Sequence, residues 1–455
     1  MKKENFVISG KSLIKDALKK IQINKEGFVL LENLNNEIYA LATDGDIRSG
    51  LLKGISLNNS IEEVGNKDFF YGFKDTSHEL LLKKLDSSIK FIPILNNDKK
   101  FINFLNKDSF PKKVESDIFY RSKSPVRISF GGGGSDVSKY FNDYGGAVIN
   151  STISLYSHAT LKINKNKKIK IHSLDLNESI EFKDLNELSF YEKGSFSLIN
   201  SVIKTVNPSF GFELYIRSDY PMSSGLGGSA VVSSAILGCF NQLRNDKWNL
   251  YELSEMAFQA ERIQLQIAGG WQDQYATVFG GFNFMEFNKK QNIIHPIRVP
   301  KSSILELEES LILCYTGINH DSGSIHDDQA EQTKSLPIKE KIKENVDLTY
   351  KMRDYLLKGK LNKLGECLNE TWKIKRSLSS KISNNRLDEI YSQALKNGVI
   401  GGKLLGAGGG GYFLFYTTPF NRHKAMNWIK KEGLIHTPFV FETNGLQSWT
   451  VRNNN

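Results

Sequence analysis

The sequence predicts a protein of mixed α and β structure (α+β and α/β) with two or three domains. Its 455 residues exceed the usual length of one domain. Two similar strand–turn–strand–helix patterns lie near the N-terminus, and three glycine-rich segments further along each adjoin a strand pattern. Hydrophobic residues make up 40% of the chain, which is enough to build more than one buried core.

The first pattern is repeated within residues 1–115. Strand patterns at Phe28–Glu32 and Ile38–Ala42 are followed by a short helical pattern, and a similar arrangement occurs at residues 91–105. A unit used twice at a spacing of about 60 residues indicates a tandem repeat. Residues 116–123 are charged and lack periodicity, so we expect them to form a linker.

The sequence ATDGDIRSGLLKG in the first repeat resembles a pair of cystathionine β-synthase (CBS) domains. This resemblance implies that Thr43 and Asp46 hold the phosphate and ribose of an adenine nucleotide (AMP, ADP or ATP). The second repeat has Asn106-Lys107-Asp108 in place of the threonine motif, so at most one such site is expected. A purely structural dimerisation module is the alternative. CBS pairs commonly self-associate, so we expect a homodimer.

The first glycine-rich segment is Ser124–Asp136 (SPVRISFGGGGSD), in which four glycines follow the strand pattern Val126–Phe130. A dinucleotide-binding fold would need a third, spaced glycine where Asp136 stands. No lysine follows any of the glycine runs in the way that a P-loop requires. Both common nucleotide folds are therefore disfavoured.

The second segment, PMSSGLGGSA, follows the strand pattern Phe212–Ile216 and precedes the apolar stretch Ala230–Leu243. Glycines let backbone N–H groups approach a phosphate closely, and the positive end of a helix dipole would lie beside it. A glycine turn before a buried helix is the alternative. The predicted phosphate-binding residues are Pro221, Ser223, Ser224, Gly225, Leu226, Gly227, Gly228 and Ser229.

The third segment, Gly401–Tyr412 (GGKLLGAGGGGY), could form a hairpin if it stood alone. Together, the three segments resemble the galactokinase–homoserine kinase–mevalonate kinase–phosphomevalonate kinase (GHMP) superfamily over about residues 120–455. The resemblance implies a ribosomal-S5-domain-2-like half at 124–305 and a ferredoxin-like half at 306–455. Gly228 departs from the family pattern, because a serine usually stands there; Ser229 is then the remaining hydroxyl for metal and phosphate.

Two carboxylates lie between the second and third segments. Glu261 belongs to a helical pattern, and Asp273 follows twelve residues later in the glycine loop GGWQDQ. Phosphoryl transfer needs one carboxylate for Mg²⁺ and one for the attacking hydroxyl. By resemblance, Glu261 and Ser229 would hold Mg²⁺, Asp273 would be catalytic, and Arg127 would keep Asp273 ionised. The alternatives are a loop-capping aspartate and a surface arginine.

Within the family, the sequence around Asp136 and GGWQDQYATVFGGFNFMEF is closest to D-glycero-D-manno-heptose 7-phosphate kinases. These enzymes use ATP to phosphorylate the anomeric hydroxyl, giving the 1,7-bisphosphate for nucleotide-activated heptose and surface polysaccharide. Asp136 would hold a substrate hydroxyl, although an N-cap for Val137–Phe141 is an equal account. Lys403 and Arg376 are candidates for binding the 7-phosphate, although for each of them an ordinary surface charge is the favoured interpretation. The expected substrate residues are Gly133, Ser135, Asp136, His320, Gly408 and Gly409.

The segment TGINHDSGSIHDDQ contains His320 and His326, six residues apart on a polar loop. This spacing is poor for a metal site on either a helix or a strand. We expect a substrate contact or a lid here; a solvated loop and a metal site are the alternatives.

The formal net charge is +10, of which +8 belongs to the residues after 120. A basic excess can reflect nucleic acid, anionic lipid or a phosphorylated small molecule. The densest basic run, Lys162–Lys170, partly alternates with isoleucine and indicates one solvated strand face. No nucleic-acid-binding signature accompanies it, so the charge is expected to serve a nucleotide and a sugar phosphate.

Other classes are disfavoured by what the sequence lacks. No apolar run approaches the ~18–20 residues that cross a bilayer, and Met1–Gly10 has no apolar signal core. Cys239, Cys314 and Cys367 are far apart, without metal-binding spacing. We therefore expect a cytoplasmic enzyme that uses ATP and Mg²⁺. A kinase for another sugar such as fucose, and a catalytically silent nucleotide sensor, are the alternatives.

Overall fold

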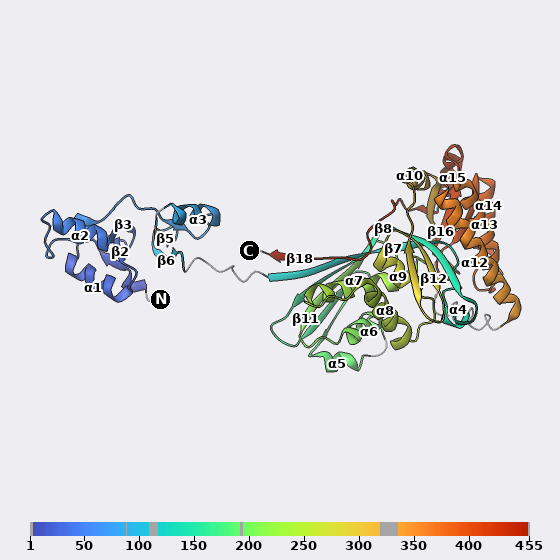
Figure 1. Cartoon of the computed structure of the whole chain (residues 1–455), viewed down its shortest axis with the longest axis horizontal. Coiled ribbons are helices and arrows are strands. Elements are labelled where there is room, and N and C mark those ends of the chain that lie inside the picture. The colour runs from blue at the N-terminus through green and yellow to red at the C-terminus, as the bar shows by residue number, and fades with distance from the viewer. Residues whose placement is uncertain (1–2, 88, 109–116, 192–193, 319–334, 454–455) are drawn as a thin grey trace. The chain divides into compact units, whose positions relative to one another are not determined.

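The computed structural model describes residues 3–87, 89–108, 117–191, 194–318 and 335–453. The chain divides into two compact units, Met1–Ser116 and Asp117–Asn455 (Figure 1). The division lies close to the predicted end of the N-terminal module at residue 115.

The N-terminal unit contains the predicted tandem repeat. In each repeat a strand lies parallel to the second strand, which pairs antiparallel with the third, and a helix connects the first two. The rings of Phe28 and Phe91, from the second strand of each repeat, stack at 3.9 Å. The elements are η1 (Lys3–Asn5), β1 (Val7–Ser9), α1 (Ile14–Asn24), β2 (Phe28–Glu32), β3 (Ile38–Thr43), α2 (Asp44–Leu52), η2 (Ile61–Val64), β4 (Gly72–Phe73), α3 (His78–Asp86), β5 (Phe91–Leu95) and β6 (Phe101–Asn106).

The second unit contains an eight-stranded sheet in the order β10-β9-β11-β8-β12-β13, in which β7 pairs with β8 and β18. Helix α7 packs against β7 and β8 of this sheet, and α6 and α8 pack against α7, within one continuous apolar core (Figure 1). The strands are β7 (Asp117–Gly131), β8 (Gly146–Ile163), β9 (Ile169–Ser173), β10 (Glu178–Phe182), β11 (Phe212–Ser218), β12 (Phe282–Phe287), β13 (Asn292–Pro296) and β18 (Gln447–Asn453). The helices are α4 (Ser138–Tyr144), α5 (Leu185–Ser189), α6 (Ser197–Val206), α7 (Gly228–Leu243), α8 (Leu250–Phe258), the π-helical η3 (Gln259–Gln264) and α9 (Gln272–Phe279).

The linker predicted at 116–123 is wrong for residues 117–123, which form the first half of β7. These residues pair with β18 at the C-terminus and with β8. Their partner in β18 lies more than 300 residues away in the sequence, so the local pattern gave no sign of a strand.

A four-stranded sheet in the order β15-β16-β14-β17 forms the C-terminal part of this unit. Its apolar core is shared with the larger sheet: Leu405 and Leu414 belong to the same cluster as Val126 and Leu226. The predicted boundary between 305 and 306 falls inside α10. The elements are α10 (Lys301–Ser310), β14 (Leu311–Tyr315), α12 (Leu336–Leu357), α13 (Leu361–Arg376), α14 (Asn385–Lys396), β15 (Val399–Leu404), β16 (Tyr412–Thr417), α15 (Pro419–Lys431) and β17 (Ile435–His436).

The cysteines and the lengths of the apolar helices bear on the class of protein. All three cysteines are buried and unbridged. Among the described residues, no helix is long and apolar enough to cross a membrane.

Candidate active site

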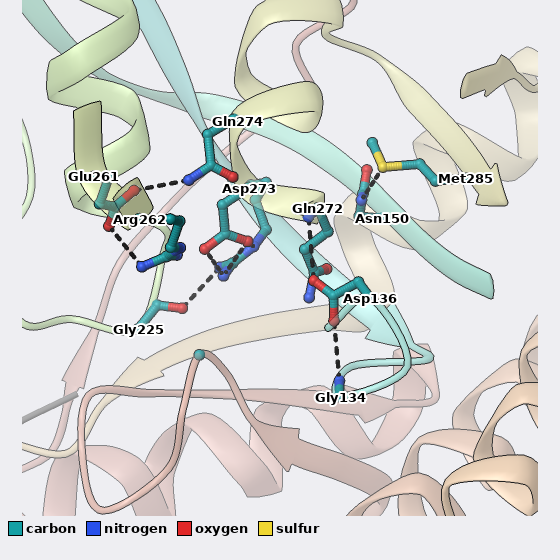
Figure 2. A network of polar contacts seen from close by, with 12 residues as sticks. Gly134, Asp136, Asn150, Gly225, Glu261, Arg262, Gln272, Asp273, Gln274 and Met285 are labelled. Atoms are coloured by element: carbon teal, nitrogen blue, oxygen red, sulfur yellow. Dashed lines mark hydrogen bonds and ion pairs between the residues drawn. The ribbon is translucent and has the colours of Figure 1, made fainter. Parts of the chain in front are cut away.

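The three glycine-rich segments meet around a cavity of about 350 Å³. The first contributes Gly133 and Gly134, the second the loop at 222–230, and the third Gly406 and Ala407. Segments far apart in sequence therefore line one site. Figure 2 shows its centre, where Asp273 lies between Glu261 and Asp136.

The second segment forms a tight loop that leads into α7. Ser223, Gly225 and Gly227 have φ values of 56°, 79° and 82°, in the left-handed region that favours glycine. A Cβ on Gly225 would lie 2.8 Å from the carbonyl oxygen of Leu405 in the third segment. The N–H of Tyr412 donates to the Ser224 carbonyl at 3.1 Å. The third segment thus supports the loop directly.

Replacing Gly225 with alanine is expected to raise the KM for ATP by about 10-fold or more, because a displacement of ~1 Å in a positioning group can cost up to about 10²-fold. The measurement is steady-state kinetics with varied ATP. Gly433→Ala is the matched control: its φ is also positive, at 71°, but nothing lies within 4 Å of the added Cβ. Equal KM values in the two variants would contradict the supporting role of the third segment.

Arg127 and Asp273 form a buried bidentate ion pair, although 146 positions separate them. The Nε of Arg127 donates to Oδ1 of Asp273, and one terminal nitrogen donates to Oδ2, both at 2.8 Å. The other terminal nitrogen donates to the Gly225 carbonyl at 2.8 Å. Arg127 is only 3% exposed. The guanidinium therefore joins the phosphate loop to the aspartate, which places Asp273 against the loop.

Glu261 lies on the π-helical turn η3, a distortion that frequently occurs at functional sites. It accepts a 2.7 Å hydrogen bond from Nε2 of Gln274, and Arg262 forms a 3.2 Å ion pair with it (Figure 2). Burial raises the pKa of Glu261 above its ordinary value, Arg262 opposes this, and Asp273 adds to it. The nearby Ser229 side chain lowers the pKa of this carboxylate. Ser229 and Glu261 therefore present oxygen atoms at one place.

Asp136 occupies the other side of the cavity. Its carboxylate accepts hydrogen bonds from the backbone N–H groups of Gly134 and Gln272, each at 3.1 Å (Figure 2). Burial and the nearby Asp273 raise its pKa. The alternative that Asp136 caps the segment at 137–141 is wrong, because α4 begins at Ser138 and its N-cap is Val137. Asp136 instead bonds to the first residue of α9.

The other predicted substrate residues have different positions. Gly133 lines the cavity, whereas the Ser135 hydroxyl is buried against backbone groups of Gly132 and Ala147. Gly408 and Gly409 pack against Ile382 rather than lining the cavity, and the Gly409 N–H donates to the Ile382 carbonyl. His320 lies outside the described residues.

Within the phosphate loop, two predicted residues contribute indirectly. Leu226 is fully buried in the shared core. Pro221 is exposed and does not line the cavity, whereas its neighbour Met222 does. Neither Leu226 nor Pro221 lines the cavity.

Five cavity-lining groups were not predicted from the sequence. Each carries a buried polar atom for which the described residues supply no hydrogen-bond partner. Ser129 and Gln272 lie inside the quoted segments SPVRISFGGGGSD and GGWQDQ but were not singled out there, and the other three lie outside the quoted glycine-rich segments. The five atoms are Ser129 Oγ, Arg262 Nε, Gln272 Oε1, Asn345 Oδ1 and Thr371 Oγ1. Unpaired buried atoms of this kind are costly unless a ligand bonds to them.

Two lysines also line the cavity: Lys375, which the sequence analysis missed, and Lys403. Lys403 is 3% exposed, so the interpretation of an ordinary surface charge is wrong. Arg376 is exposed and pairs with Asp388 at 2.6 Å, away from the cavity.

In the N-terminal unit, Thr43 and Asp46 form a capping box at the start of α2. The Thr43 hydroxyl and backbone N–H both donate to Asp46 Oδ2, at 2.7 and 2.8 Å, and the Asp46 N–H donates to the Thr43 hydroxyl. The pair therefore has a complete structural role in the helix terminus.

Comparison with known proteins identifies the second unit. Residues 197–281 match the GHMP kinases N terminal domain, and residues 352–427 match the GHMP kinases C terminal domain. The D-glycero-alpha-D-manno-heptose 7-phosphate kinase of Campylobacter jejuni is 34% identical over 340 residues, which cover 73% of this chain and 99% of that protein. The L-fucokinase/L-fucose-1-P guanylyltransferase of Bacteroides fragilis is 27% identical over 68% of this chain and 35% of that protein.

Solved structures agree with the sequence relatives. A D-glycero-D-manno-heptose 1-phosphate kinase from Bacteroides thetaiotaomicron superposes with a TM-score of 0.61 and 28% identity, covering 73% of this chain and 99% of that one. Lactococcus lactis galactokinase shares the fold, with a TM-score of 0.57 and 20% identity. The match covers 74% of this chain and 95% of the galactokinase chain. The chain therefore belongs to the GHMP kinase family and is an ATP-dependent phosphotransferase.

Proposed function

We propose that this enzyme transfers the γ-phosphoryl group of ATP to the anomeric hydroxyl of D-glycero-D-manno-heptose 7-phosphate, giving the 1,7-bisphosphate for nucleotide-activated heptose. The observation that carries the proposal is the 34% identity to the Campylobacter jejuni enzyme over 99% of its length. The polar and cationic wall of the cavity, described above, suits a hydroxyl-rich, phosphorylated acceptor.

The phosphate loop at 223–229 holds the triphosphate. Its glycines expose backbone N–H groups, and α7 directs its positive dipole end toward the anion. A Cβ on Gly227 would lie 3.3 Å from Cγ of Asp273, so the aspartate is close to the place where the phosphates would bind. Donor and acceptor thus meet at Asp273.

Asp273 orients the acceptor hydroxyl and takes its proton as the bond to phosphorus forms. Arg127 fixes both carboxylate oxygens at 2.8 Å, so the carboxylate cannot rotate away from the acceptor. The same guanidinium carries a positive charge beside the transferred group, where negative charge is shared among oxygens in the transition state. Asp136 and Gln272 hold the sugar on the opposite side.

Ser229 and Glu261 suit a magnesium ion because both present oxygen atoms. Among the described side chains, the buried carboxylate of Glu261 has only Arg262 as a cationic partner. The described residues contain no cluster of three histidine, cysteine, aspartate or glutamate side chains. Such a sparse donor set is typical of Mg²⁺ bound with nucleotide phosphates. When bound, the ion would neutralise charge on the β- and γ-phosphates.

A panel of acceptors tests the substrate. We expect D-glycero-D-manno-heptose 7-phosphate to give a kcat/KM at least about 10²-fold above L-fucose and D-galactose, because buried polar groups left unpaired by the wrong substrate are costly. Coupled ADP release gives the rates, and ³¹P NMR of the product identifies the phosphorylated oxygen. A higher kcat/KM for fucose would replace the proposal with the fucokinase alternative.

We also propose that residues 1–115 form a CBS pair that self-associates. Their repeated strand–helix–strand–strand order supports this. Because Thr43 and Asp46 already bond to each other, nucleotide binding would have to add to the capping box rather than replace it. A thermal shift of the full chain by AMP that disappears in Thr43→Ala supports a nucleotide site; no shift leaves a dimerisation role, which sedimentation of the full chain would measure.

A further inference from the structure

Two lysines enter the cavity from the C-terminal part of the second unit. Nζ of Lys403, on β15, donates to the Phe130 carbonyl at 3.4 Å. Nζ of Lys375, on α13, donates to the carbonyls of Leu404 and Gly406 at 2.9 and 2.6 Å. Both amines are therefore held in place by backbone carbonyls, and both line the cavity.

Among the carboxylates of the described residues, none lies within ion-pair distance of Lys375 or Lys403. The pKa of Lys403 is lowered to about 7, because burial and the nearby Arg127 lower it more than Asp136 raises it. Burial lowers the pKa of Lys375 well below its ordinary value, and Lys403 and Arg127 add to this effect. Holding two uncompensated amines at one place costs folding free energy, so the fold alone does not explain them.

Lys403 lies on the acceptor side of the cavity, and Lys375 lies close enough to interact with it electrostatically, beside the third glycine segment. Phe130, which Lys403 contacts, directly precedes the glycine run that carries Asp136. Lys375 shares its helix face with Thr371, whose hydroxyl has no partner in the described structure. The triphosphate, in contrast, already has the phosphate loop and the start of α7. A second anion could accept hydrogen bonds from both lysines, because an ammonium group has three N–H donors and these carbonyls occupy one on Lys403 and two on Lys375.

We propose that Lys375 and Lys403 bind the phosphate group that the sugar substrate already carries, so that the acceptors of this enzyme are sugar monophosphates rather than free sugars. This inference rests on the proposed function. A phosphate dianion between two ammonium groups supplies the missing charge and forms charge-assisted hydrogen bonds. Arg376, which was considered for this role, is already paired with Asp388 at the surface.

The test compares Lys403→Met and Lys375→Met in the full-length enzyme with D-glycero-D-manno-heptose 7-phosphate and with the same heptose lacking phosphate. Methionine keeps the length and the apolar stem. We expect each variant to raise the KM for the phosphorylated sugar by about 10–100-fold, the usual range for losing hydrogen bonds to a charged group. The kcat/KM for the free heptose and the KM for ATP should change by less than about 2-fold, within the range of substitutions that remove no contact.

Lys373→Met is the matched control. Lys373 lies two residues before Lys375 on α13, but its side chain is 61% exposed and pairs with Glu370. It should behave as the unchanged enzyme. Melting temperatures establish folding: because methionine removes a buried amine, neither cavity variant should melt below the unchanged enzyme.

The dependence on pH gives a second measurement. Since the pKa of Lys403 is lowered to about 7 in the free enzyme, its ammonium is lost as the pH rises through 7. The KM for heptose 7-phosphate should therefore rise between pH 7 and pH 9, and the KM for free heptose should not. Calorimetry at pH 8 in buffers with different ionisation heats should detect proton uptake when heptose 7-phosphate binds, and Lys403→Met should reduce it.

Different results would contradict the inference and the proposed function. A raised KM for ATP in the lysine variants, or an equal loss with both sugars, would overturn the inference and leave the proposed function intact. Absence of proton uptake would do the same. If the unchanged enzyme phosphorylates only free sugars, the proposed function itself fails, and that result is obtained before any variant is made.

Discussion

Replacing Asp273 with asparagine is expected to lower kcat by about 10²–10⁴-fold, the usual contribution of general acid–base catalysis. Asparagine fits the same space but cannot accept the proton of the attacking hydroxyl. It also carries no charge to face Arg127, whose two hydrogen bonds to the carboxylate are both 2.8 Å long. The phosphate loop keeps its hydrogen bonds to Arg127 and to Tyr412, so ATP should still bind. Single-turnover kinetics and calorimetric titration of ATP measure the two properties.

Loss of folding must be separated from loss of catalysis in this variant. Arg127 is 3% exposed, and a buried charge that loses its partner can cost about 3–5 kcal/mol. The melting temperature should therefore fall while the ATP dissociation constant is retained. Asp246→Asn is the control, since Asp246 pairs with Arg244 on the surface with 81% of its side chain exposed. Retention of most of the activity in Asp273→Asn would contradict the catalytic assignment.

The sequence was most informative where chemistry depends on local geometry. Glycines before a helical pattern predicted the phosphate loop. Two of them, Gly225 and Gly227, have the positive φ values that few other residues adopt. The three glycine segments could be placed around one site only through their joint resemblance to a family. Arg127 and Asp273 illustrate this: no local rule joins residues 146 positions apart, but both lie in recognisable motifs.

Local patterns were least informative where a residue depends on a distant partner. The charged segment at 117–123 gave no strand signal, because its partner is β18 at the other end of the chain. Lys375 resembled any lysine on the polar face of a helix; only the approach of the third glycine segment, whose carbonyls accept its hydrogen bonds, encloses it. Gly408 and Gly409 were assigned to substrate, but they allow close packing against Ile382 instead.

Replacing Glu261 with glutamine is expected to raise the Mg²⁺ concentration for half-maximal activity by at least about 10-fold, as is usual when the shell around a metal is altered. At saturating Mg²⁺, kcat should still fall by about 10²–10³-fold, since charge stabilisation by a metal is worth several kcal/mol. Glutamine keeps an oxygen that can accept the hydrogen bond from Gln274, but it removes the negative charge beside Ser229.

Stability and a matched variant distinguish this loss of metal binding from misfolding. Burial raises the pKa of Glu261, so the folded enzyme carries a penalty for its ionised form at neutral pH, and a neutral amide removes that penalty. Arg262 loses its ion pair in exchange. We therefore expect little net change in melting temperature beside the large loss of activity. Glu255→Gln, an exposed position on α8, should leave both the Mg²⁺ dependence and kcat unchanged. If Glu261→Gln shows the Mg²⁺ dependence of the unchanged enzyme, Glu261 is not a metal ligand.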